Sequence, residues 1–296
     1  MKGGPAVFIA GCGDVGGRVA KLWAARGAVI TALARSGESA ARLARLGIVP
    51  VRGDLDDPGT LREIPSRGAF LYYLAPPPES GEEDPRARAF LAALPPGGEP
   101  ARAVYASTTA VYGDNRGAWV TEETPALPAT ARGKRRLDAE RAFLGWGRER
   151  GVPVVILRVS GIYGPGRLPV EAVRRGAPVV REGEAPWTNR IHADDLAAVC
   201  VAAMERGRNC AIYNVADGLP GTITQYYNAV ADLLGLPRPP AVSMEEARRV
   251  VGPGMLSYLS ESRRLDARRM REELGVALRY PGLAAGLPSC IAKEGG

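Results

Sequence analysis

Short apolar segments alternate with longer segments of helical periodicity through the first half of the chain. The apolar segments are nearly continuous, which is typical of strands that are buried on both faces of a sheet. Strands and helices that alternate in this way form a parallel sheet with right-handed crossovers. The expected strands are 6–10, 29–33, 48–51, 69–74, 103–107 and 154–159, and the expected helices are 15–26, 38–46, 84–94 and 132–150. The sequence therefore predicts an α/β fold with a doubly wound parallel sheet.

The second half of the chain has a different pattern, which begins after Gly164-Pro165-Gly166. Segment 193–206 is predicted to be a helix, and segment 211–215 a strand that returns to the sheet. Capping-box patterns at Thr222-x-x-Gln225 and Ser243-x-x-Glu246 predict two further helices. The chain then divides into a core of residues 1–165, re-entered at 188–216, and a small mixed C-terminal cap within residues 166–296. We expect a small-molecule substrate in the cleft between core and cap.

The composition is that of a folded protein with an apolar core: 296 residues, 46% hydrophobic and 24% charged. The longest uninterrupted apolar run, 196–204, is much shorter than the roughly 20 residues of a membrane span. The first residues run directly into the expected first strand and carry no cleavage site of a signal peptide. We therefore expect a cytoplasmic protein without a membrane partner.

Cysteine, histidine and charge exclude several kinds of site. The four cysteines are far apart and form no C-x-x-C pair, so we expect no metal site and no disulfide framework. We expect the single histidine, His192, to donate a structural hydrogen bond. The net charge is +7, but the arginines alternate with Glu and Asp on the expected helices. This pattern predicts solvated helix faces and no nucleic-acid partner.

The first expected strand ends in a glycine motif, Gly11-x-Gly13-x-x-Gly16. Gly11 allows a tight turn, Gly13 lets the backbone approach a pyrophosphate, and Gly16 lets the following helix pack closely on the strand. The phosphates then face the free N–H groups where the helix begins, near Asp14 and Val15. Because the motif follows a strand and opens a helix, it predicts a Rossmann-type core that binds a dinucleotide.

The end of the second expected strand bears on which dinucleotide is bound. NAD sites usually place an acidic residue there, which hydrogen-bonds the ribose 2′-hydroxyl group. This chain has Arg35 at that point and no acidic residue before Glu38. An arginine pairs well with a 2′-phosphate. The sequence therefore predicts NADP as the cofactor, with NAD as the alternative.

Several later motifs resemble the extended branch of the short-chain dehydrogenase/reductase superfamily, the sugar-nucleotide epimerase/dehydratase type. They are residues 105–114 (YASTTAVYGD), 157–166 (LRVSGIYGPG) and 190–196 (RIHADDL). The C-terminal segment resembles a small bacterial subgroup of atypical members. The resemblance implies that Asp54 and Leu55 lie beside the adenine of the cofactor and that Leu74 and Ala75 lie near its ribose. It also implies a possible homodimer, formed through helices 84–94 and 132–150.

The family's chemistry uses a Tyr-x-x-x-Lys pair and a Ser or Thr that hydrogen-bonds the substrate oxygen. The resemblance matches Thr108 to the hydroxyl residue and Lys134 to the lysine, which also contacts the cofactor. It then places Thr130 at the tyrosine position. An aliphatic hydroxyl is a far weaker acid than a phenol, whose pKa is about 10. The sequence therefore predicts that the usual proton relay lacks its tyrosine.

Three interpretations of this gap stay open. Another group supplies the proton, and the candidates are Tyr72, Tyr73, Tyr163 and Asp114. Alternatively, the protein reduces a carbonyl slowly or through water. In the third interpretation it binds NADP without turnover, as a sensor or regulatory protein. We expect an oxidoreductase or epimerase-like enzyme that acts on a carbonyl or hydroxyl group, and the silent binder is the alternative.

Overall fold

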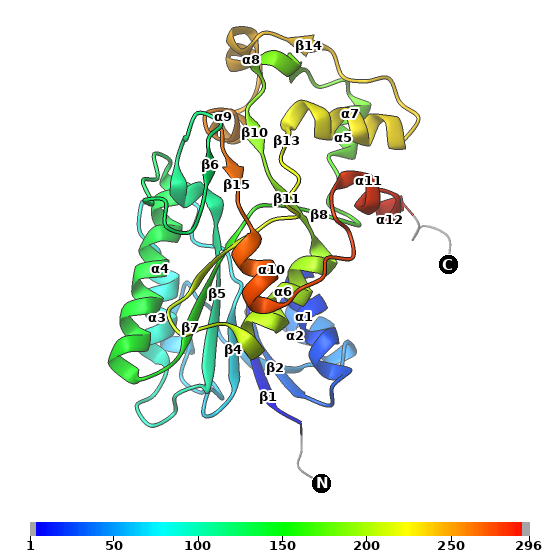
Figure 1. Ribbon diagram of the computed structural model, residues 1–296. Helices are drawn as coiled ribbons and strands as arrows, with labels where there is room; N and C mark the ends of the chain where they lie inside the picture. The colour runs from blue at the N-terminus through cyan, green and yellow to red at the C-terminus, as the bar shows by residue number, and fades with distance from the viewer. Residues whose placement is uncertain (1–3, 292–296) are drawn as a thin grey trace.

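A seven-stranded sheet in which every neighbouring pair is parallel forms the centre of the computed structural model, which describes residues 4–291 (Figure 1). The strand order is β12 (Ile212–Val215), β7 (Val154–Val159), β5 (Arg102–Thr108), β4 (Phe70–Tyr73), β1 (Ala6–Ala10), β2 (Val29–Ala34) and β3 (Val49–Arg52). Each apolar segment that we expected to be a strand forms one of these strands. The expected α/β fold with a doubly wound parallel sheet is confirmed.

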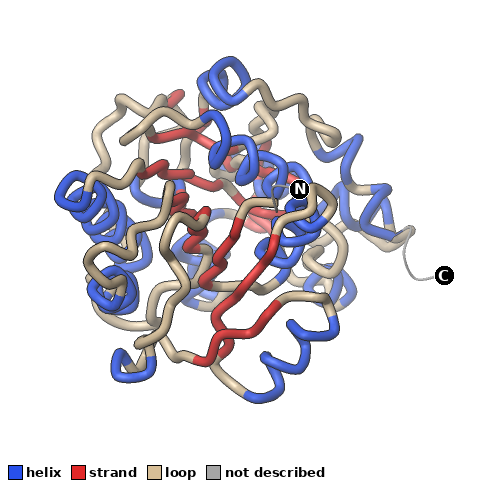
Figure 2. Tube along the Cα trace, turned by 90° about the horizontal axis from the view of Figure 1, so that it is seen from below, coloured by secondary structure: helices blue, strands red, loops and turns tan. Residues whose placement is uncertain are grey.

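Helices cover both faces of this sheet, which Figure 2 shows from below. The helices α1 (Asp14–Ala24), α2 (Gly37–Arg45) and α6 (Ala193–Arg206) lie on one face, and α3 (Pro85–Ala93) and α4 (Ala131–Arg150) on the other. Strand β1 contributes to both apolar clusters: Val7 and Ile9 pack with the α1 side, while Phe8 and Ala10 pack with the α3 side. Since side chains alternate along a strand, a strand buried on both faces needs a continuous apolar run.

The sheet changes its direction of growth between β1 and β4. Strands β2 and β3 follow on one side of β1, and β4, β5, β7 and β12 on the other. The backbone N–H of Leu74, just after β4, donates to the carbonyl of Ala10 at 2.7 Å. Open α/β sheets bind ligands in the crevice at such a switch point, beyond the carboxyl ends of the strands. The loop after β1 therefore lies where a ligand is expected.

The expected cap is built from short elements, which gather in the upper part of Figure 1. Both predicted capping boxes form, with Thr222 before α7 (Ile223–Leu233) and Ser243 before α8 (Met244–Val250). The short strands pair as β8 (Gly161–Tyr163) with β11 (Arg190–His192), β10 (Trp187–Thr188) with β13 (Gly221–Thr222), and β9 (Val179–Val180) with β14 (Ala241–Val242). The helices here are α5 (Val170–Arg174), α7 (Ile223–Leu233), α8 (Met244–Val250) and α9 (Pro253–Leu259).

One part of the segment that we expected in the cap packs on the core instead. Strand β15 (Arg264–Leu265) pairs with β6 (Trp119–Val120), and α10 (Arg268–Leu274) packs against α6 and β12. Buried Met270 and Leu274 of α10 join the apolar cluster on the α1 side of the sheet. The apolar face of α10 is therefore covered by the core and not by the cap.

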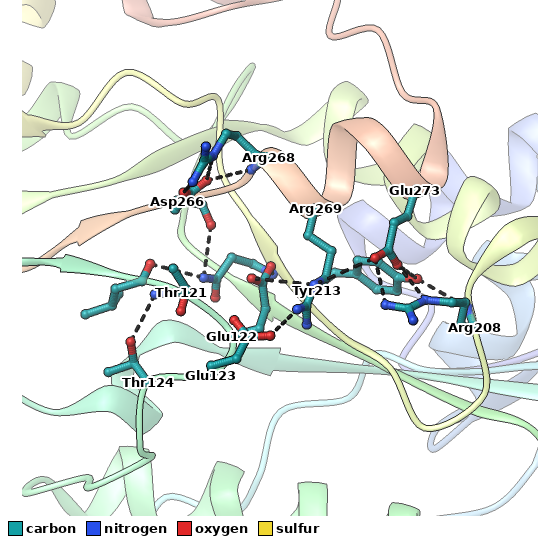
Figure 3. A network of polar contacts seen from close by, with 12 residues as sticks. Thr121, Glu122, Glu123, Thr124, Arg208, Tyr213, Asp266, Arg268, Arg269 and Glu273 are labelled. Carbon is teal, nitrogen blue, oxygen red and sulfur yellow. Dashed lines mark hydrogen bonds and ion pairs between the residues drawn. The ribbon is translucent and has the colours of Figure 1, made fainter.

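Ion pairs between α10 and the core surround this contact (Figure 3). Arg269 of α10 pairs with Glu123, and Arg208 donates to Glu273 of α10 at 2.7 and 2.8 Å. After α10, the short helices α11 (Leu283–Gly286) and α12 (Pro288–Ile291) complete the described chain. Leu287 packs with the apolar cluster of the cap. The C-terminal region thus contacts both core and cap.

His192 precedes helix α6, and each of its two ring nitrogens makes a hydrogen bond. Its Nδ1 accepts the backbone N–H of Asp194 at 3.1 Å, and its Nε2 lies 3.2 Å from the hydroxyl of Ser289. Burial lowers the pKa of His192, so the ring is neutral and can accept. At the helix start the ring accepts, because the residue that precedes a helix satisfies free N–H groups. The proton of the neutral ring is then on Nε2, which donates to the hydroxyl of Ser289, since that hydroxyl itself donates to the carbonyl of Gly286 at 2.7 Å. His192 is therefore a donor toward Ser289 and an acceptor toward the helix.

No helix within residues 4–291 is both long and apolar enough to cross a membrane.

Candidate cofactor and substrate site

The loop after β1 has the backbone that its glycine motif requires. Gly11 has φ of +93°, and a Cβ atom there would lie 2.3 Å from the backbone nitrogen of Ala75. A Cβ atom on Gly16 would lie 2.7 Å from the carbonyl oxygen of Gly11. Both positions therefore exclude a larger residue. Around Gly13, in contrast, no described atom lies within 4 Å of a Cβ position, so the space above this backbone is open to a ligand.

The N-terminus of α1 faces this open space with free donors. Gly13 precedes α1, and no side chain caps the helix there. The first N–H groups, from Asp14 and Val15 onward, therefore have no partner within the helix, and the helix dipole favours an anion. An open glycine backbone next to an uncapped helix start fits the pyrophosphate of a dinucleotide.

The carboxylate of Asp14 is compensated by two arginines. It accepts from Arg18 at 2.8 Å and from Arg167 at 2.5 Å. Partial burial raises the pKa of Asp14, but the two arginines outweigh burial and leave it below its usual value. Arg167 belongs to the expected cap, so this ion pair joins the cap to the glycine loop.

The other expected cofactor residues surround the same crevice. Leu74 and Ala75 follow β4 and lie against Gly11. Asp54 and Leu55 follow β3, where the backbone N–H of Asp54 donates to the hydroxyl of Thr60 at 2.8 Å. Arg35 is exposed at the end of β2. The carboxyl ends of β1 to β4 therefore bring these residues to one edge of the sheet.

A cavity of about 460 Å³ lies between core and cap. Thr108 at the end of β5 lies on its wall, as does Arg167, which pairs with Asp14 of the glycine loop. The cap contributes aromatic rings to the same wall, namely Trp187, Tyr226, Tyr227 and Tyr258. The candidate substrate cavity and the candidate dinucleotide loop are therefore neighbours.

Thr130 and Lys134 do not lie on the cavity wall. Thr130 caps helix α4: its hydroxyl accepts the N–H of Gly133 at 3.3 Å and donates to Glu261 at 3.2 Å. The ammonium group of Lys134 pairs with Glu82 at 2.6 Å on the exposed surface. Of the three expected catalytic residues, only Thr108 reaches the cavity.

A different pair of α4 residues, Arg132 and Arg136, faces this region with the same spacing of four. Arg132 lies on the cavity wall. Arg136 donates to the carbonyls of Ala75 at 3.2 Å and Ala106 at 3.0 Å, beyond β4 and within β5. No local signal distinguishes this register from that of Thr130 and Lys134, because the burial of Glu140, four residues after Arg136, is set by the fold.

The four candidates to replace the missing tyrosine do not lie on the cavity wall. Tyr72 and Tyr73 are buried inside β4, and the hydroxyl of Tyr72 donates to the carbonyl of Cys200 at 3.3 Å. The hydroxyl of Tyr163 donates to the carbonyl of Gly282 at 3.0 Å. Asp114 accepts the backbone N–H of Ser262 at 2.9 Å. The phenols on the wall come instead from α7 and α9, in a region without a recognisable motif.

The wall carries more positive than negative charge. Its cations are Arg132, Arg167, Arg190 and Arg263, and its one carboxylate among the described residues is Glu261. Arg263 pairs with Glu261 at 3.0 Å, and Arg132 lies 3.6 Å from the same carboxylate. The guanidinium of Arg132 also stacks on the ring of Tyr258, 4.0 Å from its centroid. The cavity is therefore suited to a polar ligand with negative charge.

Comparison with known proteins gives matches over the whole chain. Residues 7–216 match the model of the NAD dependent epimerase/dehydratase family. The solved structure of a functionally unknown conserved protein from Silicibacter pomeroyi is 31% identical, with a TM-score of 0.82 over 99% of this chain and 100% of that chain. The UDP-glucose 4-epimerase of Thermotoga maritima shares the fold at 19% identity, with a TM-score of 0.77 over 97% of each chain. Protein YeeZ of Escherichia coli is 29% identical over 61% of this chain and 59% of its own length.

Proposed function

Because this chain belongs to the NAD dependent epimerase/dehydratase family, we propose that it is an NAD(P)-dependent oxidoreductase or epimerase-like enzyme acting on a carbonyl or hydroxyl group of a small molecule. The observation that carries the proposal is the cavity that begins at Thr108 and shares Arg167 with the glycine loop. This arrangement puts a substrate site next to the site of a nicotinamide dinucleotide.

The residues that hold the cofactor are those of the glycine loop and of the strand ends around it. Gly11, Gly13 and Gly16 with the first N–H groups of α1 would hold the pyrophosphate. The side of the crevice next to β4 and β5 is bounded by Ala75 and by Arg136, whose guanidinium is fixed by carbonyl groups. When bound, the cofactor supplies or accepts a hydride.

Three side chains of this protein then act on the substrate oxygen. Thr108 hydrogen-bonds it, and the guanidinium of Arg132 stabilises negative charge that develops there. An arginine stays protonated in proteins, so Arg132 does not exchange the proton itself. The phenol of Tyr258, whose ring stacks on this guanidinium, is the proposed proton donor. Thr130 and Lys134 are left with structural roles.

The hydroxyl of Thr108 gives the first test. Turnover of NADPH with a panel of carbonyl substrates should fall at least about a hundredfold in Thr108→Ala, the usual scale for loss of a positioned polar group. Thr108→Ser keeps the hydroxyl and should retain most of the activity. An unchanged rate in Thr108→Ala would remove this residue from the mechanism.

NADP is the proposed form of the cofactor. Arg35 is exposed where a 2′-phosphate is expected, and no carboxylate within residues 4–291 lies within ion-pair distance of it. Calorimetry should give a dissociation constant for NADPH at least about tenfold lower than for NADH, since a hydrogen bond to a charged group contributes roughly 1.5–3 kcal/mol. Arg35→Gln should bring the two constants close together, whereas Arg45→Gln, an exposed arginine of α2, should not.

A silent binder is the second candidate function. Two observations favour it. The hydroxyl of Thr130 is used in a helix cap, and the four-residue pair near Thr108 consists of arginines. In that case no substrate of the carbonyl panel oxidises NADPH. The cofactor nevertheless raises the melting temperature, because it binds the folded chain alone.

A further inference from the structure

Arg190 differs from the other arginines of the cavity in what surrounds its charge. It lies in β11, which pairs with β8, and its side chain lies on the cavity wall. Its guanidinium stacks on the ring of Tyr226, 3.8 Å from the centroid. Its hydrogen bond within the described residues runs from Nη2 to the hydroxyl of Thr188 at 3.3 Å. Most of its five N–H donors are therefore available to a ligand.

No carboxylate in the part of the chain that the structure describes lies within ion-pair distance of Arg190. The carboxylate that interacts electrostatically with Arg190 is that of Asp217, which follows β12. This carboxylate accepts the N–H of Leu219 at 3.0 Å. Burial lowers the pKa of Arg190 from its ordinary value, which reflects a positive charge withdrawn from water without full compensation.

Each neighbouring cation has a carboxylate within ion-pair distance. Arg263 and Arg132 share Glu261, and Arg167 pairs with Asp14. Among the arginines on this wall, Arg190 is the one without a carboxylate of the described residues at ion-pair distance. A cation of this kind, next to an aromatic ring and a hydroxyl, is suited to an oxyanion that it can bind with two parallel hydrogen bonds.

We infer that Arg190 is the anchor of an oxyanion subsite in the substrate cavity, which binds a carboxylate or a phosphate group of the substrate. The substrate is then a small organic acid or phosphate ester that also carries the carbonyl or hydroxyl group presented to Thr108. Thr188 and Tyr226 position the guanidinium of Arg190. The inference rests on the proposed function only in assigning this cavity to the substrate.

The test uses the full chain saturated with NADPH, so that the dinucleotide site cannot bind the probes. Calorimetry is carried out with benzoate, with its neutral isostere benzamide, and with inorganic phosphate. We expect benzoate or phosphate to bind with one site per chain and benzamide to bind at least about tenfold more weakly. A preference for benzoate identifies a carboxylate site, and a preference for phosphate identifies a phosphate site.

Variants connect this binding to Arg190. Arg190→Gln should weaken the preferred anion at least about tenfold and leave benzamide and NADPH unchanged, since one charge-assisted pair contributes roughly 1.5–3 kcal/mol. Arg190→Lys keeps the charge and should show an intermediate loss. It also serves if Arg190→Gln does not fold. Arg174→Gln, an exposed arginine paired with Glu171, is the matched control and should bind like the wild type.

Two results overturn the inference: equal binding of benzoate, benzamide and phosphate by the wild type, or unchanged anion binding in both Arg190 variants. Neither result touches the proposed function, provided that NADPH still binds. Failure of the wild type to bind either pyridine dinucleotide would instead refute the proposed function.

Discussion

Arg158 and Arg190 lie in different regions of the molecule, and only Arg158 has a carboxylate partner among the described residues. Arg158 lies in β7 and is 4% exposed. Its Nη2 donates to Glu140 at 2.8 Å and its Nε donates to the same carboxylate at 3.1 Å. Arg190 lies in β11 beside the cavity, where its neighbours are a hydroxyl and an aromatic ring. No carboxylate of residues 4–291 lies within ion-pair distance of it.

The core extends the compensation of Arg158 into a network. Glu140 also accepts from the hydroxyl of Ser107 at 2.5 Å, and the ring of Tyr112 lies under the guanidinium, 4.7 Å from its centroid. Burial lowers the pKa of Arg158, but the bond to Glu140 outweighs it and raises the pKa overall. A satisfied charge of this kind stabilises one arrangement of β5, β7 and α4, whereas an unsatisfied one leaves a place for a ligand.

The largest effect is expected when the core pair is broken. Arg158→Met leaves the carboxylate of Glu140 buried and unpaired, so the free energy of unfolding should fall by about 3–5 kcal/mol. Urea denaturation followed by circular dichroism measures this loss. Arg174→Met removes an exposed partner of Glu171 and should cost less than about 1 kcal/mol. A small effect of Arg158→Met would mean that the core does not depend on this pair.

A second test uses the buried acid of the cap side. Burial raises the pKa of Asp217 to about 6, from 3.8. An acid with a raised pKa in the folded state favours folding while it is protonated, and this contribution is lost as the pH rises from about 4 to above 6. Asp217→Asn should therefore gain stability relative to the wild type over this range, by on the order of 2–3 kcal/mol at pH 7. The amide oxygen can still accept the N–H of Leu219.

Denaturation of wild type and Asp217→Asn at pH 4.5 and pH 7 separates this effect from a change in packing. A constant difference between the two proteins at both pH values would contradict it. Glu171→Gln, on the exposed surface, is the control and should show no such dependence on pH.

Local sequence patterns were sufficient to predict some parts of the fold, but not contacts between residues that are far apart in the sequence. The strands were predictable because each is a local apolar run, and the turn at Gly11 was predictable because its glycines are local too. The position of α10 was not, since its partners α6 and β12 lie far away in the sequence. Local patterns do not record which distant surface covers an apolar helix face.

The register of α4 illustrates the same limit within the site. A motif with a spacing of four fits Thr130 and Lys134 as well as it fits Arg132 and Arg136. The choice is made by the contact of Glu140 with Ser107, 33 residues earlier, which turns one face of the helix toward β5. The phenol of Tyr258 reaches the cavity through the fold of the cap, for which no motif was available.

The smallest change in the free energy of unfolding is expected when the substitution made at Arg158 is repeated at Arg190. This pair of variants compares the two arginines directly. Arg190→Met removes a charge that has no carboxylate partner, and the methionine chain can still pack on Tyr226. The free energy of unfolding without ligand should therefore change by less than about 1 kcal/mol, or rise. With NADPH and the anion preferred by the wild type present, the stabilisation by that anion should disappear in this variant, since binding to the folded state raises the melting temperature by mass action. A loss of 3 kcal/mol or more in the ligand-free protein would show that Arg190 is a structural charge like Arg158, with compensation supplied by the fold itself.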